Sequence, residues 1–174
     1  MNYQSCFDII GPIMVGPSSS HTAGVVSIGK FVHDYMGGPP ERSEIVFYDS
    51  FAETYQGHGT DKAIVGGLLG MKTDDIGIRH ALEEASRRNV IINFCLEGSC
   101  PHYDHPNTVM TWNERNGEIF SIGGVSLGGG VSKIFLIDGL KVDLPLNEPV
   151  DMDELRNKAR KKLSKDAAVA VKEG

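Results

Sequence analysis

The first half of the chain alternates between helix-like and strand-like runs of apolar residues. Apolar side chains recur at spacings of three and four over residues 21–35, which is typical of an amphipathic helix. The same spacing predicts two more helices, and short runs of β-branched and aromatic residues predict strands between them. The expected helices span residues 21–35, 60–69 and 75–88, and the expected strands span residues 45–48 and 90–96.

The second half of the chain is predicted to be mainly β. Asn116-Gly117 and Asp138-Gly139 are dipeptides favoured in tight hairpin turns, and a glycine-rich stretch at 123–130 is expected to interrupt the strands. The expected strands span residues 108–112, 118–122, 133–137 and 141–144. Together the two halves predict an α+β (mixed α/β) fold, with helices packed on a mixed, partly antiparallel sheet.

The pattern changes again after residue 150. Acidic side chains come first and basic side chains follow, which is the order that a helix dipole favours. The apolar stripe of this helix is narrow, so it is either a lightly docked surface helix or a contact surface for another chain. We therefore expect one domain over residues 1–150 and a charged C-terminal helical segment over residues 151–174.

Composition narrows the classes of partner. The net charge of -6 disfavours binding to a nucleic acid backbone, which usually requires a basic face. No apolar run approaches the roughly 20 residues of a membrane span, and the N-terminus lacks a signal peptide, so we expect a cytoplasmic protein. The three cysteines fall short of the four thiolates that usually hold an iron–sulfur cluster.

The segment Gly16–Thr22, with the sequence Gly-Pro-Ser-Ser-Ser-His-Thr, is the first candidate site. It lies where a helix is expected to begin, and the free N–H groups and positive dipole end of a helix attract a carboxylate. The same dipole lowers the pKa of a histidine, so His21 is expected to be neutral and able to accept a proton. The alternative is that Ser20 or Thr22 simply caps the helix.

The segment Gly57–Lys62, with the sequence Gly-His-Gly-Thr-Asp-Lys, is the second candidate site. Glycines on both sides of His58 allow the backbone and the imidazole to approach a substrate closely, and Thr60 can cap the helix that follows. The alternative is a histidine in a turn with no further role.

Three other groupings are weaker signals. His105-Pro106-Asn107-Thr108 reads as a turn, in which Asn107 could also bind an amine or a carboxylate. The stretch from Ser126 to Gly130 could form a nest of N–H groups for an anion, or a plain bulge and bend. Cys95 and Cys100 with nearby histidines suggest zinc, but their spacing is irregular and structural or free cysteines are preferred.

Taken together and in this order, the segments Gly16–Thr22, Phe51–Asp61 and His105–Thr108 resemble the beta chain of bacterial iron–sulfur-dependent L-serine dehydratases. The resemblance covers roughly residues 4–145. It implies a domain similar to the allosteric substrate-binding domain of phosphoglycerate dehydrogenases. Two positions depart from the family pattern: Asp49 stands where a glycine is usual, and a charged helix follows residue 150 instead of a regulatory domain.

The resemblance also implies a partner and a reaction. An alpha chain supplies the cysteines for a 4Fe-4S cluster, and the two chains together convert L-serine to pyruvate and ammonia. We expect a hetero-oligomer, with a homodimer through this domain as a further arrangement, and no metal ligand in this chain. The expected catalytic residues are His58, as the base, and His21. The expected substrate-binding residues are Ser18, Ser19, Ser20, Thr22, Gly59, Thr60, His105, Asn107, Ser126, Gly128, Gly129 and Gly130.

Two other classes of function compete with this interpretation. The first is a non-catalytic regulatory domain that binds serine at the same serine-rich helix start. The second is a serine hydrolase that uses Ser20, a histidine and Asp61, but no Gly-X-Ser-X-Gly elbow is present. Copurification of a cysteine-bearing alpha chain would separate the dehydratase from the sensor.

Overall fold

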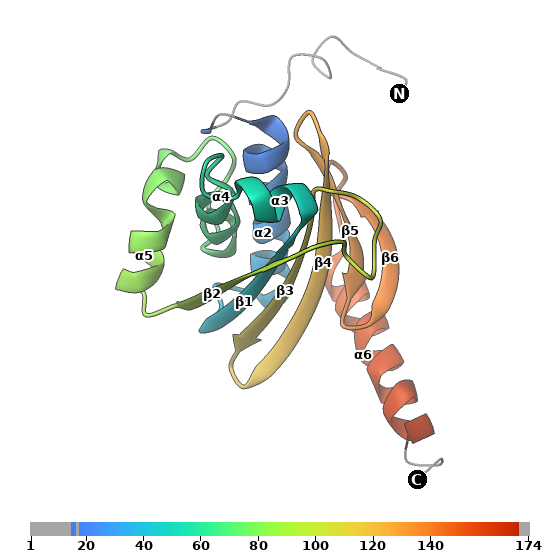
Figure 1. Ribbon diagram of the computed structural model, residues 1–174. Coiled ribbons are helices and arrows are strands. Elements are labelled where there is room, and N and C mark those ends of the chain that lie inside the picture. The colour runs from blue at the N-terminus through green and yellow to red at the C-terminus, as the bar shows by residue number, and fades with distance from the viewer. Residues whose placement is uncertain (1–14, 17, 171–174) are drawn as a thin grey trace.

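A computed structural model describes residues 15, 16 and 18–170, and it has helices packed on a six-stranded sheet (Figure 1). The sheet order is β2-β1-β3-β4-β5-β6, in which β1 and β2 are parallel and the other neighbours antiparallel. The helical elements are the π-helical turn η1 (Ser19–Ala23), α2 (Gly24–Met36), α3 (Asp49–Thr54), α4 (Thr60–Leu68), the 3-10 turn η2 (Ile76–His80), α5 (Ala81–Arg87) and α6 (Met152–Ala170). The strands are β1 (Arg42–Tyr48), β2 (Ile91–Glu97), β3 (Thr108–Arg115), β4 (Glu118–Gly128), β5 (Val131–Ile137) and β6 (Leu140–Pro145).

The expected α+β class with a mixed sheet is confirmed. Each expected helix and strand has a counterpart, but the helix expected at 75–88 is divided into η2 and α5. The Asn-Gly and Asp-Gly dipeptides form the turns that they predict. The sequence pattern missed the short helix α3, because its six residues are too few to establish a helical spacing of apolar positions.

The glycine-rich stretch at 123–130 was expected to interrupt the strands, and this prediction is wrong for its first part. Strand β4 continues to Gly128 and contains both Gly123 and Gly124. A Cβ atom on Gly124 would lie 2.7 Å from Ile28 of α2, and one on Gly123 would lie 2.6 Å from Phe135 of β5. These glycines are therefore required by side chains that press on both faces of the strand, and not by a turn.

The sheet separates two apolar clusters. The larger one fills the space between the sheet and the helices, where Ile45 and Phe47 of β1 meet Ile28 of α2 and Ile64 of α4. The smaller one lies on the other face, which the loop between β2 and β3 crosses (Figure 1). The ring of Tyr103 in this loop stacks on Phe135, with centroids 4.8 Å apart. Both faces of the central strands are thus protected from water at the end where β1 finishes.

Helices α2 and α4 cross at a pair of glycines. A Cβ atom on Gly29 would lie 2.4 Å from the carbonyl oxygen of Ile64, and one on Gly67 would lie 2.4 Å from the carbonyl oxygen of Val26. Backbone atoms of the two helices therefore touch with no side chain between them. Because α2 follows His21 and α4 follows His58, this crossing fixes the relative positions of the two candidate histidines.

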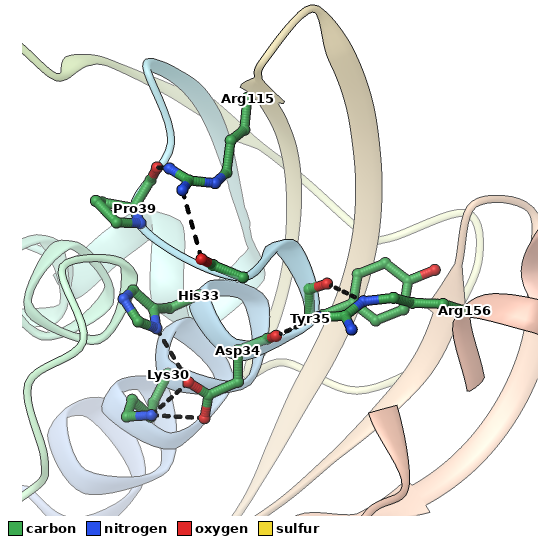
Figure 2. A network of polar contacts seen from close by, with 8 residues as sticks. Lys30, His33, Asp34, Tyr35, Pro39, Arg115 and Arg156 are labelled. Carbon is green, nitrogen blue, oxygen red and sulfur yellow. Dashed lines mark hydrogen bonds and ion pairs between the residues drawn. The ribbon is translucent and has the colours of Figure 1, made fainter. Parts of the chain in front are cut away.

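The C-terminal end of α2 is held by arginines from two other elements (Figure 2). Arg115 of β3 donates a 2.6 Å hydrogen bond to the carbonyl oxygen of Pro39. Arg156 of α6 donates hydrogen bonds of 2.7 and 2.8 Å to the carbonyl oxygens of Tyr35 and Asp34. The last carbonyl groups of a helix lack the N–H donors of a following turn, so Arg156 supplies donors to Tyr35 and, beside the N–H of Gly37, to Asp34, and it attaches α6 to α2.

The expected C-terminal helix is present as α6. Its first half is docked, because Leu155 and Ala159 are buried in the helix-side core, whereas Leu163 is exposed and the second half extends away from the sheet (Figure 1). The two-part division at residue 150 stays a prediction. Among the residues that the structure describes, no helix is both long enough and apolar enough to cross a membrane.

Candidate active site

The segments singled out in the sequence meet at one end of the sheet. Strand β3 runs antiparallel to β1, and β4 runs antiparallel to β3. The end of β1, the start of β3 and the end of β4 therefore lie at the same end of the sheet. The backbone N–H of Phe51 donates to the carbonyl oxygen of Pro106 at 3.3 Å, and that of Ser126 donates to the carbonyl oxygen of Asn107 at 3.0 Å. These bonds bring α3, the loop before β3 and the end of β4 together.

Asp49 turns the chain from β1 into α3. Its φ of 43° is in the left-handed region, where glycine is favoured and aspartate is tolerated better than most residues, so this backbone suits the glycine that the resemblance led us to expect here. Its N–H donates to the carbonyl oxygen of Gly98, and its carboxylate accepts a 3.4 Å hydrogen bond from Ser99. The next residue, Ser50, is thereby presented to His21.

His21 has hydroxyl partners on both ring nitrogens. Its Nδ1 lies 3.0 Å from Ser20 Oγ and 3.4 Å from Ser18 Oγ, and its Nε2 lies 3.4 Å from Ser50 Oγ. It sits in the π-helical turn η1, a form of helix that often marks functional sites. Ser50 was missed in the sequence analysis, because only the fold brings it close to a residue 29 positions earlier.

The prediction that Ser20 or Thr22 caps helix α2 is wrong. Helix α2 begins at Gly24, and no side chain accepts a hydrogen bond at its N-cap position, Ala23. Instead, Ser18 Oγ accepts a 3.2 Å hydrogen bond from the backbone N–H of His21, so the preceding π-helical turn takes up the free donors. The backbone of Ser19 lies in the same turn, but its side chain falls outside the described residues, as does Cys6.

Burial lowers the pKa of His21, and the nearby His58 lowers it further by charge repulsion. The expected direction of the shift is therefore confirmed, but its cause is burial and a second histidine, and not the helix dipole. A lowered pKa keeps His21 neutral near pH 7, so that one nitrogen donates a hydrogen bond and the other accepts one.

The lowered pKa of His21 predicts that the fold becomes less stable in acid. Its folded-state pKa is below the value of roughly 6.5 for an unfolded chain, so the unfolded chain binds more protons and stability falls as the pH drops below that value. We expect wild-type protein to lose more stability than His21→Asn between about pH 7.5 and 5.5. Urea unfolding at several pH values measures this difference, and parallel losses in both proteins would contradict the prediction.

His58 packs against His21 and has a free nitrogen. The two rings meet edge to face with centroids 4.7 Å apart, and His58 Nδ1 is buried without a hydrogen-bond partner. The hydroxyl of Thr22 donates to the backbone carbonyl of His58 at 3.3 Å, which ties the two motifs together. A buried polar atom that lacks a partner is rare in folded proteins, and it is commonly explained by a catalytic role or a missing ligand.

At the start of α4 it is Gly59, and not Thr60, that occupies the N-cap position. The N-cap is Gly59, whose φ of 68° requires left-handed backbone, and Thr60 is the first helical residue. The Thr60 hydroxyl is buried and has no hydrogen-bond partner, so the expectation that it caps the helix is wrong. Thr60 is two residues after His58, so a second buried group without a partner among the described residues lies in the same segment as the histidine.

His58 also lines a hollow of about 820 Å³ that carries positive charge. Lys62 and Arg79 contribute cations to its wall, and none of the described residues that line it is acidic. A small anion such as a carboxylate is therefore favoured there. Arg79 was not predicted, because it lies in η2, outside the segments that the sequence singled out. Lys62 belongs to the second candidate segment, but no role was predicted for it.

Two further predicted site residues, His105 and Ser126, lie in a turn and in the sheet. His105 Nδ1 accepts a 3.1 Å hydrogen bond from the backbone N–H of Asn107, which stabilises the expected turn before β3. Ser126 lies opposite Ser132 in the sheet, and both hydroxyls are buried without a partner. Ser126 thus adds a third unpaired group at this end of the sheet.

Residues 128–130 form the turn between β4 and β5. All three glycines have positive φ, at 92°, 60° and 81°, and an N–H nest instead requires backbone of alternating sign. This favours the bend over the anion nest.

Among the described residues no three His, Cys, Asp or Glu side chains are grouped for a metal ion, and Cys95 and Cys100 are free, so a four-thiolate cluster does not fit this part of the chain.

The fold and the site define an α+β domain that groups two histidines, several hydroxyls and a cationic hollow at one end of its sheet. The sequence profile of the serine dehydratase beta chain family matches residues 5–116. The chain therefore belongs to the serine dehydratase beta chain family.

The names of similar proteins support this family assignment. The chain is 47% identical over 150 residues to a probable L-serine dehydratase beta chain of Bacillus subtilis (strain 168), covering 86% of this chain and 67% of that protein. It is 40% identical over 144 residues to the L-serine dehydratase beta chain of Peptoniphilus asaccharolyticus, covering 82% and 64%. An L-serine dehydratase of Escherichia coli (strain K12) is 29% identical over 177 residues, which cover 84% of this chain but 37% of that protein. The chain thus spans about two thirds of the two beta chains.

Proposed function

We propose that this chain is the beta component of an iron–sulfur-dependent L-serine dehydratase, acting in the cytoplasm with a cluster-bearing alpha chain to convert L-serine to pyruvate and ammonia. The observation that carries the proposal is the buried, unpaired Nδ1 of His58 beside His21, at the wall of a hollow that also contains Lys62 and Arg79. The descriptions of the relatives as beta chains of L-serine dehydratases support it.

Dehydration of serine needs a base on carbon and an acid on oxygen, because the α-proton is weakly acidic and hydroxide leaves poorly. His58 takes the α-proton, the bond between the β-carbon and its oxygen breaks, and the proton held by His58 converts the departing hydroxide to water, which leaves aminoacrylate. Aminoacrylate tautomerises to the imine, and water hydrolyses the imine to pyruvate and ammonia. His58 suits the role of base because it is the histidine of the pair that has a ring nitrogen without a partner among the described residues.

His21 and its hydroxyl partners hold the substrate and position His58. Ser18, Ser20 and Ser50 bracket the His21 ring, which fixes its orientation and keeps it packed against His58. The cations that line the hollow attract the serine carboxylate, and the unpaired hydroxyls of Thr60 and Ser126 remain available for the amine or the carboxylate. The further residues assigned to substrate binding are Ser19, Thr22, Gly59, His105, Asn107, Gly128, Gly129 and Gly130.

The proposal needs a second chain to complete the site. Two free cysteines lie in the described part of this chain, and they do not form a metal-binding group. When bound to the alpha chain, the cluster supplies a Lewis acid for the departing hydroxyl. The match to 37% of the longer Escherichia coli enzyme supports a division in which the remaining length corresponds to the partner.

Anaerobic reconstitution with the purified alpha chain tests the proposal. The mixture is expected to form pyruvate from L-serine, and each chain alone is expected to be inactive. Pyruvate is measured with a coupled dehydrogenase assay, and D-serine is the matched control substrate. Binding of L-serine to this chain without turnover in the mixture would contradict the proposal and favour a serine-sensing domain.

A further inference from the structure

The tip of the β4–β5 hairpin, residues 127–131, exposes apolar side chains next to the proposed site. Leu127 and Val131 are 42% and 45% exposed, and they flank the three glycines of the turn. A Cβ atom on Gly128 or Gly129 would meet nothing within 4 Å. These glycines of the tip are therefore open to a neighbouring molecule.

The hairpin tip carries no charged side chain. Residues 127–131 contain no acidic or basic side chain, although 23% of the whole chain is charged. The register of β4 and β5 shifts between Ser126 and Gly128, so Leu127 lies in a β-bulge. A bulge redirects a side chain, and bulges are frequent beside active sites. Exposed apolar residues without charged neighbours are typical of the centre of a protein interface.

The position of the tip indicates what covers it. Ser126, the residue before Leu127, donates its backbone N–H to Asn107 of the proposed substrate site. Figure 1 shows the tip, in orange, rising at the same end of the sheet as the start of α2 and α3. A chain that covers this end to complete the site must therefore lie beside the tip.

We propose that the β4–β5 hairpin tip is a docking element for the cluster-bearing alpha chain, with Leu127 and Val131 entering an apolar recess of that partner. This inference rests on the proposed function, because it is the composite site that places the alpha chain at this end of the sheet. The unpaired hydroxyl of Ser126, one residue from the bulge, links the docking element to the substrate site. Docking of the tip would thereby fix β4 beside the bound substrate.

Binding of purified alpha chain to Leu127→Asp and Val131→Asp tests the inference. A carboxylate placed in an apolar recess is expected to weaken the complex by roughly tenfold or more, as measured by anaerobic titration calorimetry. Ile119→Asp is the matched control, because Ile119 is 73% exposed on the same strand but lies at the opposite end of the sheet. The control is expected to bind like wild type, and thermal unfolding confirms that all variants are folded.

The outcomes separate this inference from the proposed function. Unchanged affinity in both tip variants, with wild-type protein that binds and turns over serine, would overturn the docking role and leave the dehydratase assignment standing. Failure of wild-type protein to bind the alpha chain would overturn both. If the isolated chain forms dimers that the tip variants disrupt while binding of the alpha chain is unaffected, the tip contacts a second copy and the inference is wrong.

Discussion

Replacing His58 by alanine is expected to lower the turnover of the reconstituted enzyme by about a hundredfold or more, the scale on which enzymes lose activity without a positioned proton-transfer group. The loss should fall on kcat, because the role proposed for His58 is proton transfer, whereas the carboxylate is assigned to the cations of the hollow. Exchange of the serine α-proton with deuterated solvent should be lost in parallel. Both readouts are obtained by nuclear magnetic resonance on the same samples.

Two further variants are compared with His58→Ala: His21→Ala, which tests the other histidine of the pair, and His102→Ala, which is the control. Loss of His21 should lower kcat and also raise KM, because its hydroxyl partners belong to the proposed substrate site. His102 is exposed in the loop between β2 and β3, so its loss should change neither parameter. Normal exchange of the α-proton in a folded His58→Ala complex would contradict the assignment and make His21 the base.

Replacing Gly67 by alanine is expected to destabilise the fold by about 1–3 kcal/mol, because its methyl group would strike backbone and the helices must separate. The Cβ atom would lie 2.4 Å from the carbonyl oxygen of Val26 and 2.7 Å from the backbone nitrogen of Lys30. Neither atom belongs to a flexible side chain that can move aside. Urea unfolding followed by circular dichroism measures the loss.

The same substitution should also reduce turnover in protein that remains folded. Separation of α2 from α4 moves His21 away from His58, whose rings now lie 4.7 Å apart. Gly98→Ala is the control, since Gly98 is exposed and a Cβ atom there would meet nothing within 4 Å. Wild-type stability and turnover in Gly67→Ala would show that the helix crossing does not position the site.

The secondary structure could largely be predicted from the sequence, because it depends on local periodicity. The spacing of Val25, Ile28 and Val32 defines one face of α2, and those residues are fully buried. The Asn116-Gly117 and Asp138-Gly139 turns were predicted for a similar reason, since their backbone conformations need residues that tolerate positive φ. Strand β4 was predicted too short because its glycines were interpreted as breakers.

The candidate site was predictable only where its residues form a recognisable segment. His21 and His58 each lie in a motif of glycine, hydroxyl and imidazole groups, and the structure brings both rings together. Ser50 and Arg79 stand in segments with no such signal. Their proximity to the histidines depends on the order of the strands and the crossing of the helices, which no local pattern records.

The sequence by itself determined the turns, the family and the elements other than α3 and the full length of β4, because each follows from residues that are close in the chain. Tertiary structure alone decided why Gly29, Gly67 and Gly124 are glycines, since the atoms that exclude a Cβ come from other elements. It likewise decided the cause of the lowered pKa of His21, which is burial together with a histidine 37 positions later. Contacts between segments far apart in sequence depend on topology, and the antiparallel pairing of β1, β3 and β4 is what gathers the site at one edge.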